Sequence, residues 1–237
     1  DGRTLASSHE DGSIYLWALD AAGACPTGQA VQVLSGHRAG VWRLVFSPDG
    51  QHLASSSDDH SVLLWAMKGL PAAVAAQPVA RFDDHRGWVR ALAFSPDGRA
   101  LASAGADRTI RVWDLRSAQL LYTLYGYVKA VKSIAFCPHS RLLVSGSDDQ
   151  RVRLWDVAGG GRCLQTWTGH TGFIWQVAVS PDGRLVASAG DDRQIYVRDA
   201  GSGQVLKILS GHNGGATAVA FSPDSKPLAS GGLDCRV

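Results

Sequence analysis

The sequence predicts an all-β protein in which one structural unit is repeated along the chain. Each unit contains a Gly-His-like pair, a Ser-Pro turn, an Asp, and a Trp or a residue in its place. Eleven residues separate the end of the pair from the Pro, eleven more lead to the Asp, and six more lead to the Trp position. Length varies only between the Trp position and the next pair, so each unit has a rigid interior and one elastic loop. The pairs end at His37, His85, Tyr127, His170 and His212.

Four short strands account for each unit, which is 42 to 48 residues long. In the unit at 84–125, an apolar and β-prone run at 88–94 ends at a Ser-Pro-Asp-Gly segment, whose residues suit a type I turn. Residues 99–104 and 109–114 form the next two strands, and residues 79–82 serve as a fourth. Four antiparallel strands per unit, without a helical period, are typical of a propeller blade.

The uniform repetition favours one continuous array over the whole chain of 237 residues. Both ends of the chain fall inside a unit, so the first and last units are incomplete. We therefore expect about five blades plus partial ends. The predicted repeats are approximately 1–35 (partial), 36–83, 84–125, 126–168, 169–210 and 211–237 (partial).

Charge and composition exclude several classes of partner. The formal net charge is +2 and there is no basic block, which argues against nucleic acid or an anionic membrane. No apolar run approaches the roughly 18 residues of a transmembrane helix, so we expect a soluble chain. The four cysteines are scattered without a C-x-x-C pair, which argues against a zinc site or a disulfide framework. Unpaired thiols fit a reducing compartment, and we expect a cytoplasmic location.

The repeated Gly-His, Ser-Pro-Asp-Gly and Trp-Asp motifs resemble those of the WD-repeat β-propeller family, and the resemblance covers essentially the whole chain. The near-identical, alanine-rich copies resemble bacterial-type arrays of this family. Propellers of the family most often close with seven blades. The resemblance therefore implies that the chain is a segment of a seven-bladed ring, with unpaired strand edges at its two ends.

The resemblance also implies a hydrogen-bonded tetrad inside each blade. It is formed by the His of the pair, a Ser of the second strand, the turn Asp and the Trp of the third strand. A buried imidazole and a buried indole N–H need acceptors, and a buried carboxylate needs donors, so the four groups complete one another. The complete tetrads are His37, Ser55, Asp59 and Trp65, and His85, Ser103, Asp107 and Trp113.

Two units depart from this pattern. In one, Tyr127 takes the place of the His, and we expect its phenol to be the group that reaches the Asp; the rest of that tetrad is Ser145, Asp149 and Trp155. In the other, Arg198 takes the place of the Trp, and we expect it to pair with the Asp electrostatically; the rest of that tetrad is His170, Ser188 and Asp192. Both blades should be locally weaker.

The sequence contains no catalytic or cofactor-binding motif. It has no Gly-x-Ser-x-Gly, no His-Glu-x-x-His, no phosphate loop and no dinucleotide fingerprint. The tetrads account for four of the eight histidines, and equivalent polar groups in separate blades cannot converge on one substrate. We therefore expect a chain that is not an enzyme and takes no cofactor, metal or small-molecule substrate.

In the family, the face that carries the His loop and the Asp turn is called the top and is the usual interaction surface, because loops converge there. Its variable positions flank the first core aliphatic residue of the first strand and precede the tetrad Asp. Carried onto this sequence, the positions implied for partner binding are Trp42, Asp58, Trp88, Arg90, Lys132, Asp148, Phe173, Trp175 and Asp191. In the unit at 84–125, the position before the tetrad Asp is Ala106.

The composition of this rim is unusual. Three of the eight tryptophans, Trp42, Trp88 and Trp175, fall on it and not at the core positions of the repeat. Beside the cations Arg90 and Lys132, they resemble the aromatic and cationic anchors of binding hot spots. The other interpretation is that these rings plug the channel or pack between neighbouring blades.

The leading hypothesis is a non-catalytic scaffold that binds a partner protein or peptide through the top rim, partly by analogy with the fold class. The alternative is that the chain is the sensor or regulatory region of a larger signalling protein, an ATPase or a Ser/Thr kinase. A propeller enzyme with a metal or quinone in its channel is disfavoured, because no inward cluster of carboxylates or histidines is identifiable.

Overall fold

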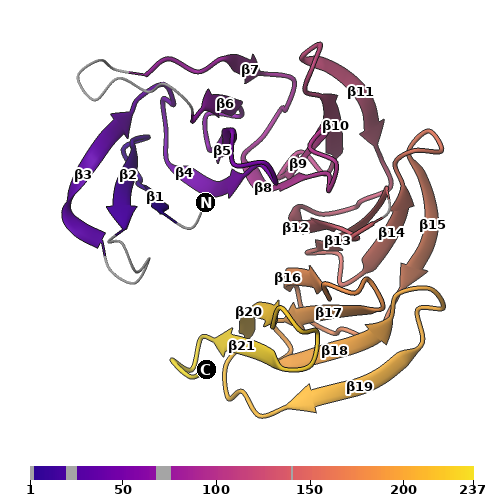
Figure 1. The fold of residues 1–237 in the computed structure, drawn as a ribbon. Helices are drawn as coiled ribbons and strands as arrows, with labels where there is room; N and C mark the ends of the chain where they lie inside the picture. The colour runs from indigo at the N-terminus through magenta and orange to yellow at the C-terminus, as the bar shows by residue number, and fades with distance from the viewer. Residues whose placement is uncertain (1–2, 20–25, 68–75, 140) are drawn as a thin grey trace.

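The computed structural model describes residues 3–19, 26–67, 76–139 and 141–237, and their regular elements form six antiparallel sheets. Figure 1 shows these sheets side by side in an open arc, each with its first strand toward the centre. This arrangement confirms the predicted all-β propeller architecture. Across the described ranges, no helix is long and apolar enough to cross a membrane.

We number the sheets as blades 1 to 6 in chain order. Blade 1 contains β1 (Thr4–Ser8), β2 (Ile14–Leu19) and β3 (Pro26–Leu34). Blade 2 contains β4 (Val41–Phe46), β5 (His52–Ser57), β6 (Val62–Ala66) and β7 (Ala80–Phe82). Blade 3 contains β8 (Val89–Phe94), β9 (Ala100–Gly105), β10 (Ile110–Asp114) and β11 (Gln119–Leu124).

Blade 4 contains β12 (Val131–Phe136), β13 (Leu142–Ser147), β14 (Val152–Asp156) and β15 (Arg162–Trp167). Blade 5 contains β16 (Ile174–Val179), β17 (Leu185–Gly190), β18 (Gln194–Asp199) and β19 (Val205–Ser210). Blade 6 contains β20 (Ala216–Phe221) and β21 (Leu228–Gly232).

One strand assignment needs correction. Residues 79–82, predicted to serve the unit at 84–125, form β7, which pairs with β6 and therefore belongs to blade 2. The fourth strand of blade 3 is β11, paired with β10. The reason is connectivity, because each strand pairs with the one before it in the chain and the fourth strand always follows the third.

The hydrophobic core lies between blades. Among the described residues, five buried clusters each join two neighbouring sheets. In one of them, Ile110 and Val112 of β10 pack with Val131 and Ile134 of β12 and with Leu143 of β13. Because blades 2 to 5 bury both faces against neighbouring sheets, their strands carry apolar residues on both faces. The blades therefore stabilise one another in sequence.

The Ser-Pro-Asp-Gly turns are closed by their own side chains. In blade 3 the Ser95 hydroxyl donates to Asp97 over 2.6 Å and accepts from the amide of Ala100 over 2.9 Å. Gly98 adopts a φ of 67°, a left-handed conformation that glycine reaches without a steric penalty. The same Ser-to-Asp bond recurs at Ser47, Ser180 and Ser222. These bonds explain why a Ser and an Asp lie two residues apart in this turn.

The tetrad of blade 2 forms a continuous chain of hydrogen bonds. The Trp65 indole N–H donates to the Ser55 hydroxyl over 2.9 Å, and Ser55 Oγ lies 2.7 Å from His37 Nε2. His37 Nδ1 lies 3.1 Å from Asp59 Oδ2. Because the indole can only donate, the hydroxyl donates onward to Nε2 and Nδ1–H donates to the carboxylate. Blade 3 repeats the chain with equal geometry in His85, Ser103, Asp107 and Trp113.

In blade 4 the expectation that the Tyr127 phenol reaches the Asp is wrong. Its hydroxyl lies 2.5 Å from Ser145 Oγ, which also accepts from the Trp155 indole. Asp149 instead pairs with Arg153 over 2.8 Å, and the Arg153 guanidinium covers the Tyr127 ring. A phenol has one polar atom where an imidazole has two, so it bonds the Ser and leaves the carboxylate to another donor.

In blade 5 the expectation that Arg198 pairs with the tetrad Asp is also wrong. Its Nη1 and Nη2 donate to the backbone carbonyls of Gly203 and Thr168. Asp192 is bonded by His170, which also lies 2.9 Å from Ser188 Oγ. In blades 2 and 3 the Trp bonds the Ser, and the Ser and the His both lie between this position and the carboxylate.

Burial and hydrogen bonding shift the tetrad pKa values in a consistent direction. Burial alone raises a carboxyl pKa, but hydrogen bonds led by those from His37 and Ser61 hold the pKa of Asp59 well below its usual range. The pKa of Asp107 is lowered in the same way by His85, Arg86 and Arg111, against the effect of burial. Burial lowers the pKa of His85 and His170, although their aspartates oppose it.

We expect Asp59→Ala to lower the free energy of unfolding by about 1–3 kcal/mol, because the N–H groups of His37 and Arg38 lose their buried acceptor. Urea denaturation measures this. The matched control is Asp83→Ala, which removes an exposed ion pair to Arg81 and should cost less than about 1 kcal/mol. Equal losses in the two variants would contradict the role of the tetrad.

We expect stability to fall as the pH drops from 7.5 to 5. The pKa of His170 is lowered from 6.5 in the folded chain, so below about pH 6.5 the unfolded chain binds more protons. The lowered carboxyl pKa values add a further loss below about pH 4. Urea midpoints at each pH should depend less on pH in His170→Gln than in the wild type. The exposed His139→Gln should behave like the wild type, and identical pH profiles in all three would disprove the assignment.

Candidate functional site

The antiparallel order of each blade places two kinds of connection on one face. Successive connections alternate between the two faces, so the turn between second and third strands shares a face with the link from one blade to the next. This face, the top, carries the tetrad His loops and Asp turns. The Ser-Pro turns lie on the opposite face.

The rim positions of the first strands are β-bulges. In blades 2 to 6 the register between the first two strands shifts after the first residue, so one extra residue lies at the top end of the first strand. A bulge redirects one side chain out of the regular alternation. The first strands of neighbouring blades lie side by side, so these residues form one row. In order, they are Trp42, Arg90, Lys132, Trp175 and Thr217.

Arg90 lies between two tryptophans. Its guanidinium carbon is 3.8 Å from the centroid of the Trp42 ring and 4.8 Å from that of the Trp88 ring. Both rings remain about half exposed, at 49% for Trp42 and 48% for Trp88. Because Trp42 belongs to blade 2 and Arg90 to blade 3, this cation–π contact ties two blades together while leaving aromatic surface open.

Lys132 makes the equivalent contact in the other direction. Its Nζ lies 4.8 Å from the centroid of the Trp175 ring in blade 5 and 3.6 Å from Asp148 of its own blade. Lys129 lies over the ring of Phe173, 5.1 Å from its centroid. The two neighbouring cations of the row therefore stack in opposite directions. Arg90 contacts Trp42 of blade 2, and Lys132 contacts Trp175 of blade 5.

The rim aspartates bind the bulge residues of their own blades. The indole N–H of Trp42 donates to Asp58, and that of Trp175 donates to Asp191 over 3.3 Å. Asp148 takes the third such position and pairs with Lys132. Burial raises the pKa of the Asp148 carboxyl, and the charge of Lys132 opposes that rise.

The structure gathers the nine predicted rim residues into two groups on the top face. Blades 2 and 3 contribute Trp42, Asp58, Trp88 and Arg90, and blades 4 and 5 contribute Lys132, Asp148, Phe173, Trp175 and Asp191. We call these nine residues the top rim. Trp42, Phe173 and Trp175 each contact a cation of a neighbouring blade, whereas Trp88 contacts Arg90 of its own blade, and Trp42, Trp88 and Phe173 are at the same time at least 40% exposed.

Sequence reasoning missed Lys129 and the bulges. Lys129 was not singled out because it lies in the connection before β12, and only its contact with Phe173 of the next blade gives it a place in the site. The bulges follow from a two-against-one register between strands. Residue spacing within one strand contains no signal for such a register.

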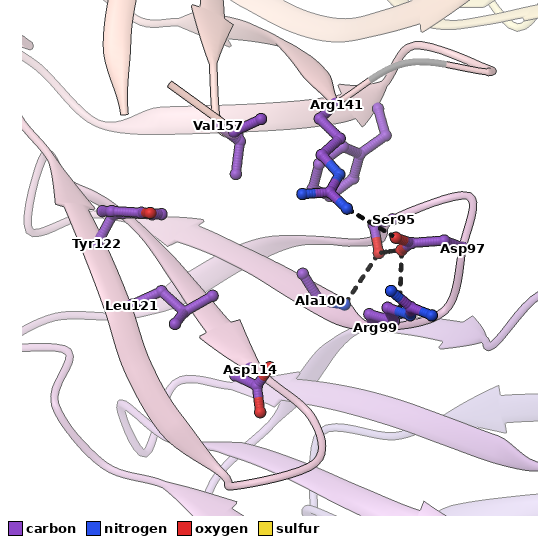
Figure 2. Close-up of a pocket in the computed structure, with 11 residues that line it drawn as sticks. Ser95, Asp97, Arg99, Ala100, Asp114, Leu121, Tyr122, Arg141 and Val157 are labelled. Carbon is purple, nitrogen blue, oxygen red and sulfur yellow. Dashed lines mark hydrogen bonds and ion pairs between the residues drawn. The ribbon is translucent and has the colours of Figure 1, made fainter. Parts of the chain in front are cut away.

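A hollow lies between blades 3 and 4 on the face opposite the top. It has a volume of about 280 Å³, and Leu121, Tyr122 and Val157 line its apolar side. Figure 2 shows that its polar wall is the turn around Asp97, whose carboxylate already accepts from Ser95 and Arg99. The two aspartates of this hollow are already bonded, Asp97 by its own turn and by Arg141 and Asp114 by Ser117, and we place the candidate site at the top rim.

The comparison with family models agrees with the repeat. The model described as WD domain, G-beta repeat matches residues 28–66, 76–114, 118–156, 161–199 and 203–237. Each matched range runs from the fourth strand of one blade, or the segment before it, into the next blade. The comparison with curated proteins gave no match.

We expect Lys132→Met to raise the pKa of Asp148 further, because the buried carboxylate loses the cation that opposes the effect of burial. Carbon-13 NMR of the aspartate carboxyl groups follows this titration. Lys207→Met, which removes an exposed lysine on β19, is the control and should leave the Asp148 titration unchanged. An unchanged pKa in Lys132→Met would exclude the coupling.

Proposed function

Because the chain belongs to the WD-repeat family, whose repeats generally mediate contacts between proteins, we propose that it is a non-catalytic interaction scaffold that binds a partner protein or peptide through the top rim. The observation that carries the proposal is the group of exposed aromatic rings held in place by cations. Nearly half of the surface of Trp42 and of Trp88 is open, although both rings are fixed by contact with Arg90.

The chemistry of the rim matches that of binding hot spots. Trp and Arg are enriched among the residues that dominate protein interfaces, and the rigid Trp ring buries a large area while losing little side-chain entropy. At this rim the rings are held before any partner arrives, by Asp58 and Asp191 at their N–H groups and by Arg90 and Lys132 at their faces. A preorganised surface loses less conformational entropy on binding.

The other residues of each blade hold the top rim in place. Strand faces are used in packing between blades, and the tetrads tie the His loop and the Asp turn to the sheet. The side chains of the top connections are therefore held in place and remain free to contact a partner. The assignment to a sensor or regulatory region of a larger signalling protein stays a prediction.

We expect the double variant Trp42→Ala with Trp175→Ala to lose at least about tenfold in partner capture, because two aromatic anchors are removed. Its melting temperature should fall by no more than about 4 °C, since these rings lie at the rim and not in a blade core. Capture from a lysate of the source organism, quantified by mass spectrometry, measures the first effect, and thermal unfolding measures the second.

The matched control is Leu121→Ala with Leu206→Ala, which removes exposed apolar side chains from the outer strands β11 and β19. This variant should capture the same partners as the wild type. If the tryptophan variant also retained the wild-type partners, the top rim would not be the binding surface. If it unfolded, the rings would belong to the core.

A further inference from the structure

We propose that a pocket at the top of blade 3 binds an anionic side chain, a carboxylate or a phosphorylated hydroxyl, carried by a partner polypeptide. The pocket has a volume of about 640 Å³ and lies beside the top rim, outside the two groups of rim residues. Three arginines line it, Arg86, Arg108 and Arg111, together with Asp84 and Asp107. The proposal rests on the proposed function only in taking the anion from a polypeptide.

Arg111 is a buried cation with unused donors. The residue is 8% exposed. Among its side-chain nitrogens, only Nη1 makes hydrogen bonds to described residues, to Asp107 over 2.6 Å and to Thr109 over 2.7 Å. The same atom lies 2.7 Å from His85 Nδ1. Its Nε is buried without a hydrogen-bond partner, and Nη2 makes no hydrogen bond to any described residue. Of the two, only Nε is buried, so Nη2 is the donor of Arg111 that an acceptor placed in the pocket can reach.

The equivalent arginine of blade 4, Arg153, makes a hydrogen bond that Arg111 lacks. Arg153 uses both Nη1, toward Asp149, and Nη2, toward the carbonyl of Gly126. In blade 3 the residue at the position of Gly126 is Asp84, and no bond from Arg111 to its carbonyl is formed. The pocket opens at this point, since Asp84 and Arg111 both line it.

The carboxylate nearest to Arg111 is already saturated. Asp107 accepts from His85, from the backbone of Arg86, from Arg111 and twice from Thr109. Arg86 and Arg108 are exposed, and neither forms an ion pair within the part of the chain that the structure describes. Besides Asp107, Asp84 is the one acidic residue that lines the pocket, whereas Arg86 and Arg108 contribute two guanidinium groups without an ion-pair partner among the described residues.

Blade 3 also lacks the rim acid of its neighbours. In blades 2, 4 and 5 the bulge residue is bonded to an aspartate, in the pairs Trp42–Asp58, Lys132–Asp148 and Trp175–Asp191. The bulge residue of blade 3 is Arg90, and the corresponding position is Ala106, which lines the pocket. The top of this blade therefore carries four arginines and no rim carboxylate, and an anion from a partner completes it.

Apolar side chains beside the arginines indicate that the anion is part of a polypeptide. Tyr125 is 70% exposed and Leu120 is 38% exposed, and both line the same pocket. A free inorganic anion gains nothing from such neighbours. A peptide segment that flanks an acidic or phosphorylated residue buries them.

The test uses the 237-residue chain and three peptides that differ only at the central residue, which is phosphoserine, glutamate or serine. Binding is followed by the NMR signals of the arginine Nε–H groups at constant ionic strength. We expect saturable binding of at least one anionic peptide, and at least about tenfold weaker binding of the serine peptide. Stronger binding of phosphoserine identifies a phosphate as the anion, and equal or stronger binding of glutamate identifies a carboxylate.

Two pairs of variants decide whether the pocket is responsible. The double variant Arg86→Gln with Arg108→Gln should bind the anionic peptide at least about tenfold more weakly, because two charge-assisted hydrogen bonds are lost. Arg38→Gln with Arg193→Gln makes the same change at the equivalent turn positions of blades 2 and 5 and should have no effect. Ala106→Asp should compete with the peptide by placing a carboxylate beside Arg90, whereas the neutral Ala106→Asn should not.

Equal binding of the three peptides, or equal losses in the two double arginine variants, would overturn the proposal. Failure of the proposed function is distinguishable, because the peptides carry no aromatic anchor for the top rim. Partner capture that survives loss of the rim tryptophans would leave the peptide result unaffected.

Discussion

The buried hydrogen-bond chain from indole to carboxylate is the interaction on which the rest of each complete blade depends. It begins at the third strand with the Trp, passes through a Ser of the second strand and a His of the preceding connection, and ends at the Asp of the top turn. None of these groups could be buried alone without a large loss of solvation. Together they fix the two top connections to the sheet, and those connections carry the candidate site.

Substitutions in this hydrogen-bond chain change the polar contacts of individual blades. Where Tyr127 replaces the imidazole, the carboxylate of Asp149 is released to Arg153, which in turn covers the phenol ring. In blade 3 the imidazole is kept and Arg111 is added, so the carboxylate of Asp107 accepts from both His85 and Arg111. The arginine that is satisfied in blade 4 is left with free donors in blade 3, and this difference gives one blade of a repetitive protein a chemistry of its own.

The top rim follows the same logic across blades. In blades 2 to 5 a β-bulge lies at the start of the innermost strand, and its residue is Trp42, Arg90, Lys132 and Trp175 in turn, so two neighbouring cations lie between two tryptophans. Arg90 and Lys132 would repel each other if they faced one another. Each instead stacks on the tryptophan beyond it, so the row is stabilised by contacts between blades and keeps its rings open to solvent.

Residue order alone predicted four strands per unit, the Ser-Pro turns, the membership of the regular tetrads and the rim positions, because these depend on fixed spacing within one unit. It assigned the strand at residues 79–82 to the wrong blade, since strand pairing is not contained in that spacing. The roles of Tyr127, Arg198 and Lys129, the bulges and the arginine pocket could be decided only by the tertiary structure. A substituted side chain takes whichever partner its length and geometry allow, and those partners belong to other strands or to the next blade. Spacing along one chain segment contains no information about such distances.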